Sequence, residues 1–165
     1  MVWLRQIGRW CIVMLLQVLL VSQLQLLGIC HPFIYILPLL LLPITLPQWA
    51  NMLIGAVVGL VMDMFCNTLG IHMASCILLM FVRPYCIQRW GTDTERITGE
   101  ITPQTLGTAS FVEYTVLLTV LHHLTVFLLT AWTFHLWWRT LLTVVVSSLV
   151  SILLIFGYVF LRDRR

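Results

Sequence analysis

The stretch Gly55–His72, GAVVGLVMDMFCNTLGIH, places an aspartate, an asparagine, a threonine and three glycines between long apolar runs. A carboxylate within such a run is costly if the run crosses a lipid bilayer, because hydrocarbon does not solvate a charge. Asp63 is therefore expected near the edge of the bilayer, or among groups that hydrogen-bond it. The rest of the sequence decides which fold surrounds it.

The composition of the chain predicts a membrane protein. Of its 165 residues, 61% are hydrophobic and only 9% are charged, and the mean hydropathy is +1.02. A soluble domain of this length needs more charge to cover its surface. All nine basic residues are arginines, and they lie near the chain ends and in one loop rather than in a stripe. This distribution argues for membrane topology and against nucleic-acid binding, so we expect one polytopic membrane domain over residues 1–165.

The apolar runs predict an all-α integral membrane protein with six transmembrane helices. The expected spans cover about residues 10–28, 33–46, 48–66, 71–87, 111–134 and 141–161, and the polar segment 88–110 is expected to be a cytoplasmic linker. The second run contains Pro38 and Pro43 and is bounded by Pro32 and Pro47. Because proline interrupts helical hydrogen bonding, we expect this span to be kinked or partly re-entrant.

The arginines also predict the orientation. With six spans, eight of the nine arginines fall on one side, and only Arg139 falls on the other. The positive-inside rule then places both termini in the cytoplasm and the turn at residues 67–70 on the outer face. Asp63 precedes that turn by one helical turn, so it lies roughly 5–6 Å deep. A charge near the interface costs less than one at the bilayer midplane.

Two features of the quoted stretch predict helix packing. Gly55 and Gly59 form a small-xxx-small pattern, which lets two helices approach closely, either within this bundle or with a partner. Asp63 has three interpretations: it accepts hydrogen bonds from a neighbouring span or from the N–H groups that begin the next helix, it contacts a partner helix, or it belongs to an ion or proton relay. We favour a structural or partner-contact role, because a relay needs several ionisable groups along a path.

Histidines and cysteines give only a weak signal for a metal site. Four candidate ligands lie near the outer turns, namely Cys30, His31, Cys66 and His72. No pair among them has the i, i+3 or i, i+4 spacing of helical ligands. His122 and His123 are adjacent on span five and point about 100° apart, so at least one is expected to hydrogen-bond another span. No hydrolase, zinc-protease or nucleotide-loop motif is present, and we expect no enzyme activity, no cofactor and no metal.

One motif in the quoted stretch consists of Gly59-Leu60-x-x-Asp63, a short polar turn, and Leu69-Gly70 followed by Ala74. This order, together with the length and the basic tail, resembles the bacterial rod shape-determining protein MreD family. The pieces HPFIYILPLLLLP, DMFCNTLGIHMAS, MFVRP and LLTVLHH look like one branch of that family, so the resemblance covers nearly the whole chain. Four residues match only these branch-like pieces, namely Pro32, Pro38, Arg83 and His122.

The resemblance implies a non-enzymatic component of the cell-elongation machinery in the bacterial inner membrane, which maintains rod shape and supports sidewall peptidoglycan synthesis. It implies an MreC-like bitopic membrane protein as partner and, through it, an MreB-like filament and a RodA–transpeptidase pair, with membrane lipid around the protein. It also implies a fold like the six-helix substrate-binding subunits of energy-coupling-factor transporters. The family motif maps onto Gly59, Leu60, Asp63 and Gly70. Together with Gly55, these residues are expected to fix the angle between spans three and four and to present a surface to a partner span.

The alternative function is that of a membrane subunit that binds a vitamin or a metal for transport. It would use His31, His72 and Asp63 as ligand contacts on the outer face, and it requires a pocket with several convergent polar groups. The predicted outer turns are short and hold few hydrogen-bonding side chains. The sequence therefore favours the scaffold.

Overall fold

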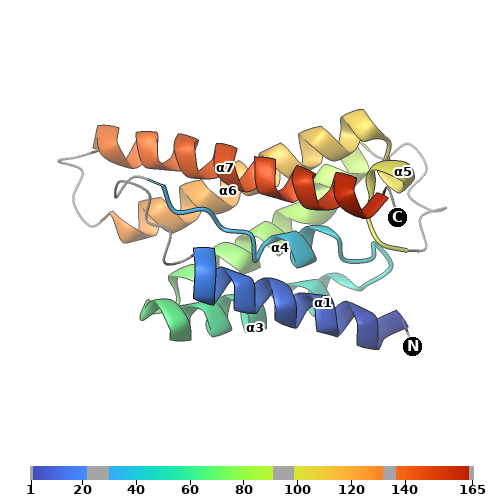
Figure 1. Cartoon of the computed structure of the whole chain (residues 1–165), viewed down its shortest axis with the longest axis horizontal. Coiled ribbons are helices and arrows are strands. Elements are labelled where there is room, and N and C mark those ends of the chain that lie inside the picture. Colours follow the sequence, from blue (N-terminus) through green and yellow to red (C-terminus); the bar gives the residue numbers. More distant parts are fainter. Residues whose placement is uncertain (1, 22–29, 91–98, 132–136, 164–165) are drawn as a thin grey trace.

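In the computed structural model, which describes residues 2–21, 30–90, 99–131 and 137–163, the regular elements are all helices (Figure 1). Four of them are long and apolar enough to cross a membrane, namely α3 (Gln48–Cys66), α4 (Ile71–Trp90), α6 (Thr108–Thr130) and α7 (Trp137–Asp163). A crossing takes about 20 residues of helix. The predicted all-α class is confirmed, and these four helices indicate a multi-pass membrane protein.

The long helices pack in the order of the chain. α3 and α4 form an antiparallel hairpin, α4 packs against α6, and α6 packs against α7 (Figure 1). Both ends of the chain lie at one end of the bundle, and the turn between α3 and α4 lies at the opposite end, together with the beginning of α7. An even number of crossings requires this placement of the termini.

The first predicted span, residues 10–28, overlaps a helix that starts earlier. α1 (Val2–Leu16) continues directly into one π-helical turn, η1 (Gln17–Val21). Residues 22–29 lie outside the described part of the chain. The helix extends toward the N-terminus because residues before Trp10 carry no proline to stop it.

The predicted second span, residues 33–46, is not a transmembrane helix. Only the single turn α2 (Leu37–Leu40) is helical, and residues 30–36 before it form a non-helical segment that runs along the centre of the bundle (Figure 1). The prolines at positions 32, 38, 43 and 47 remove N–H donors too often for a long helix to form. The kinked-helix alternative is therefore wrong, and the partly re-entrant alternative stays a prediction. The segment is buried: Tyr35, Ile36 and Leu39 have no exposed surface.

Backbone that is not helical needs other hydrogen-bond partners inside a membrane protein. Gln17 supplies several of them from η1. Its amide Nε2 donates to the carbonyl of Pro32 at 3.1 Å, and its Oε1 accepts from the N–H of Ile34 at 2.6 Å. On the other side, two α7 serines accept from this segment: Ser147 from the N–H of His31 and Ser151 from that of Phe33, each at 2.9 Å.

The boundaries of the remaining predicted elements also shift. Within the predicted linker 88–110, α4 runs on to Trp90, a short helix α5 (Pro103–Leu106) forms behind a Thr102 capping box, and α6 already begins at Thr108. The described part of the linker is tied to α7 by an ion pair of 2.7 Å between Glu100 and Arg162. The fifth predicted span, 111–134, corresponds to α6, with residues 132–134 outside the described part. The sixth, 141–161, lies within the longer α7.

Candidate functional site

The two glycines of the small-xxx-small pattern lie against α4. A Cβ on Gly59 would stand 2.4 Å from the Cα of Met73 and 2.6 Å from the carbonyl oxygen of His72. A Cβ on Gly55 would stand 2.7 Å from Cγ of Met80. At Gly59 only glycine permits this approach, because a Cβ does not come this close to backbone atoms in folded proteins. The seam that the glycines form is therefore internal, between α3 and α4.

Asp63 caps the N-terminus of α4. Its Oδ1 accepts from the N–H of His72 at 3.0 Å and its Oδ2 from the N–H of Met73 at 2.9 Å, and the hydroxyl of Thr68 also donates to Oδ1. Because α4 begins at Ile71, these N–H groups belong to the first turn and have no partner within the helix. A carboxylate here also faces the positive end of the helix dipole. The buried charge in the apolar run thus has three donors directed at it.

The polar residues between α3 and α4 make the chain reverse. Asn67 ends α3 in the left-handed conformation (φ 53°), and its N–H bonds to the carbonyl oxygen of Asp63. Asparagine tolerates this conformation better than most residues. Gly70 follows with φ 80°, a value that a side chain disfavours. The turn, the cap and the glycine seam together form the α3–α4 joint, which we define as Gly55, Gly59, Asp63, Asn67 and Gly70.

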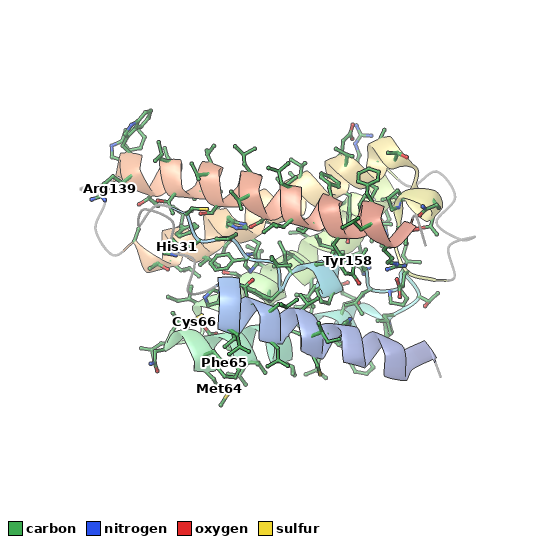
Figure 2. All side chains as sticks on the ribbon, viewed as in Figure 1. His31, Met64, Phe65, Cys66, Arg139 and Tyr158 are labelled. Carbon is green, nitrogen blue, oxygen red and sulfur yellow. The ribbon has the colours of Figure 1, made fainter. Side chains whose placement is uncertain are left out.

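Of the five predicted site residues, the structure brings four into the α3–α4 joint and leaves one outside. Leu60 points away from α4 and is 49% exposed. It belongs to an outward stripe on α3 whose other members are Leu53, Val57 and Met64. Figure 2 shows the Met64 side chain directed away from the bundle. A residue of the motif is therefore available to the surroundings of the protein.

A second polar group lies in the core, centred on the hydroxyl of Tyr35. This hydroxyl is 2.9 Å from Nδ1 of His72 and 2.7 Å from Nε2 of His122, so it joins the non-helical segment to α4 and α6. Cys76 Sγ lies 3.9 Å from the same oxygen. The ring of Phe33 packs edge-on against both imidazoles, with centroid distances of 5.2 and 5.7 Å. We call Tyr35, His72, Cys76 and His122 the tyrosine cluster.

The tyrosine cluster fixes the histidine tautomers. A hydroxyl has one proton, so Tyr35 donates to one ring and accepts from the other. Nδ1 of His122 is buried with no partner among the described residues. An unpaired N–H donor is costlier than an unpaired lone pair, so this nitrogen carries no proton. We therefore assign Nε2–H of His122 as donor to Tyr35, which in turn donates to Nδ1 of His72.

His123 connects α6 to α7 through a separate chain of hydrogen bonds. Its Nδ1 donates to the carbonyl oxygen of Thr119 at 2.8 Å, so its Nε2 accepts from the hydroxyl of Ser151 at 3.1 Å. Ser151 in turn accepts from the N–H of Phe33. The expectation that at least one of the two adjacent histidines bonds another span is confirmed. His123 bonds α7, whereas His122 bonds Tyr35 of the non-helical segment.

Arg83 is buried near the end of the bundle that carries the termini. Its Nε donates to the hydroxyl of Tyr114 at 3.0 Å, that hydroxyl donates to the carbonyl oxygen of Leu40 at 2.8 Å, and the guanidinium also donates to the carbonyl oxygen of Leu42. The side chain is 1% exposed. The carbonyl oxygen of Leu42, just beyond α2, and the hydroxyl of Tyr114 therefore accept hydrogen bonds from this cation, and Tyr114 in turn bonds the last residue of α2.

The sequence interpretation missed the partners of the non-helical segment. Gln17, Tyr35, Ser147 and Ser151 are buried polar residues, and none was singled out from the sequence. One signal was present: the two serines are four residues apart in an apolar run, which places both on one helix face.

The candidate ligands His31 and His72 do not meet, since His72 lies in the tyrosine cluster and His31 bonds α7. Within the described residues, no group of three or more His, Cys, Asp or Glu side chains is arranged to hold a metal ion.

Removing the hydroxyl of Tyr35 tests the tyrosine cluster. In Tyr35→Phe the volume is nearly unchanged, but Nδ1 of His72 loses its hydrogen-bond partner and Nε2 of His122 keeps only the Sγ of Cys76 at 3.8 Å. We expect a loss of about 1 kcal/mol in the free energy of unfolding, measured in detergent by denaturant titration. The matched control is Tyr85→Phe, whose side chain is 60% exposed on α4 and whose unfolding midpoint should not change. Equal midpoints for both variants would contradict the assigned hydrogen bonds.

The two sites lie side by side, because His72 supplies its N–H to Asp63 and its ring to Tyr35. Comparisons of the chain with protein-family models, with curated proteins and with solved structures find no match. The geometry of the α3–α4 joint and the tyrosine cluster is therefore the basis for the functional argument.

Proposed function

We propose that this protein is a non-enzymatic membrane scaffold of the bacterial cell-elongation machinery, located in the inner membrane with both termini in the cytoplasm. In this proposal it binds an MreC-like bitopic protein and, through it, an MreB-like filament and a RodA–transpeptidase pair. One observation carries the proposal: Gly59, Asp63 and Gly70, which define the resemblance to the MreD family, meet at one joint. If the match to the motif were due to chance, we would not expect all three residues to hold the same helix pair, α3 and α4, together.

Some residues of the motif face α4 and one faces outward, which suggests how the scaffold binds its partner. Three motif residues are used internally to set the angle between α3 and α4. Leu60 is not, and it lies in the outward stripe with Leu53, Val57 and Met64. A rigid hairpin that presents an apolar stripe fits a single-helix partner, because helices in lipid associate through close side-chain packing.

The contacts weigh against the alternative of a solute-binding transport subunit. That function requires His31, His72 and Asp63 to converge on a ligand. Both oxygens of Asp63 accept hydrogen bonds from α4 and its preceding turn, and Nδ1 of His72 accepts from Tyr35. A solute would have to displace these internal bonds, so the scaffold is the better account of the same residues.

Depletion of the protein in its rod-shaped host tests the function directly. We expect cell width, measured by microscopy, to increase until the cells round up, while uptake of labelled vitamins and metal ions stays unchanged. Cells that keep their shape but require an added vitamin or metal would reject the scaffold and support transport.

The partner surface is tested with Leu60→Trp, which leaves the α3–α4 joint intact but alters the outward stripe. We expect several-fold less MreC-like protein to co-purify, with an unchanged melting temperature. The matched control is Leu153→Trp on α7, at a side chain that is 69% exposed. If both variants retain the partner equally, the outward stripe is not the contact surface.

A further inference from the structure

Two adjoining hollows lie between the end of α6 and the beginning of α7. The first has a volume of about 370 Å³ and is mainly apolar, with Leu124, Leu128, Leu141 and Val144 in its lining. The second has a volume of about 290 Å³, and its lining includes His31, Arg139, Thr140 and Thr143. Ala131 and Thr140 line both hollows, so an apolar space and a polar space meet there.

The polar hollow carries a positive charge that has no counter-charge among the described residues. Arg139 is exposed at the end of the bundle opposite the termini, near His31 (Figure 2). Within the described ranges, its guanidinium and the Thr140 hydroxyl have no ion-pair or hydrogen-bond partner. α7 begins two residues earlier, at Trp137, so the dipole of a 27-residue helix also favours an anion at this end.

We propose that this crevice binds one anionic membrane phospholipid. Its phosphate lies at Arg139 and Thr140, and one of its acyl chains lies along Leu124, Leu128 and Leu141. The proposal follows from adjacency: a soluble anion would satisfy the charge and leave the apolar hollow empty, and a neutral hydrocarbon would do the reverse. A phospholipid carries an anionic headgroup next to apolar acyl chains, so one molecule matches the polar hollow and the adjoining apolar hollow together. The inference is independent of the proposed scaffold function.

Native mass spectrometry of the purified full-length chain in detergent tests the proposal. The protein is mixed with equal amounts of phosphatidylglycerol and phosphatidylcholine, and the retained lipid is identified. We expect one tightly retained lipid, with phosphatidylglycerol preferred by about fivefold because one arginine attracts the anionic headgroup. Arg139→Gln should remove this preference, whereas Arg89→Gln, which changes an exposed arginine of α4, should keep it.

A second variant tests the apolar half. Leu141→Trp adds bulk to the apolar hollow and should lower retention of both lipids several-fold, whereas Leu153→Trp on the same helix should not. Unchanged melting temperatures show that the variants are folded. An unchanged lipid preference in Arg139→Gln, or full retention in Leu141→Trp, would overturn the proposal. Displacement of the lipid by inorganic phosphate would also overturn it, because the charged end alone would then account for binding.

Discussion

Gly59→Ala is expected to lower the free energy of unfolding by about 2–3 kcal/mol, a large effect for the addition of one methyl group. The new Cβ would stand 2.4 Å from the Cα of Met73 and 2.6 Å from a carbonyl oxygen. Both are backbone atoms of α4, so the strain is relieved only if the two helices separate. Unfolding of the purified protein by denaturant in mild detergent measures the change. Gly59→Leu should go further and prevent assembly with a partner, because the α3–α4 joint can no longer close.

Two other glycines provide the controls for this prediction. Gly157→Ala on α7 adds a methyl group with no atom within 4 Å, so it should be neutral or slightly stabilising. Gly55→Ala should be milder than Gly59→Ala, because its nearest contact is the flexible side chain of Met80. If Gly59→Ala unfolded at the same midpoint as Gly157→Ala, the close approach of α3 and α4 at this position would be wrong.

Asp63→Ala is expected to cost about 3 kcal/mol, because it leaves the buried N–H of His72 and the partly buried N–H of Met73 and hydroxyl of Thr68 without an acceptor. Asp63→Asn should cost less, since one side-chain oxygen still accepts. The same denaturant titration ranks the three proteins. We also expect amide hydrogen exchange to increase at the first turn of α4 in Asp63→Ala, which a general loss of stability would not confine to that turn.

Glu113→Ala is the matched control, because it removes an exposed carboxylate from α6 that contributes no cap. Its unfolding midpoint should equal that of the unaltered protein. If Asp63→Ala also left the midpoint unchanged, the cap would carry no stability, and the charge would have to be explained by a contact outside this chain.

The sequence was sufficient for the long helices because their signal is local. α3, α4, α6 and α7 are each long and apolar, Asn67 and Gly70 mark the turn between the first two, and the predicted positions differ from the observed ones by a few residues. The second apolar run could not be interpreted in this way. Its composition suits a membrane span, but its conformation depends on Gln17, Ser147 and Ser151, which lie far away in the sequence.

The candidate site likewise has one part that could be predicted from the sequence and one part that could not. Asp63 and the first turn of α4 are within ten residues of each other, so the cap was among the interpretations that the sequence allowed. The tyrosine cluster was not predictable, because it joins Tyr35, His72 and His122 from three elements that only tertiary packing brings together. Apolar periodicity indicates which faces are buried, but it does not indicate which polar groups meet there.

The non-helical segment of residues 30–36, which precedes α2, constrains how the chain enters a bilayer during synthesis. A helix can partition into lipid alone because it carries its own hydrogen bonds, but this segment cannot. The N–H of His31 bonds to Ser147, which is 116 residues later in the chain. The hydrogen-bond partner of His31 is therefore synthesised long after His31 itself. We therefore expect this segment to stay in water or within the translocase, outside the lipid, until the helices have inserted. Biogenesis of this protein then ends with the docking of an early segment onto a late one.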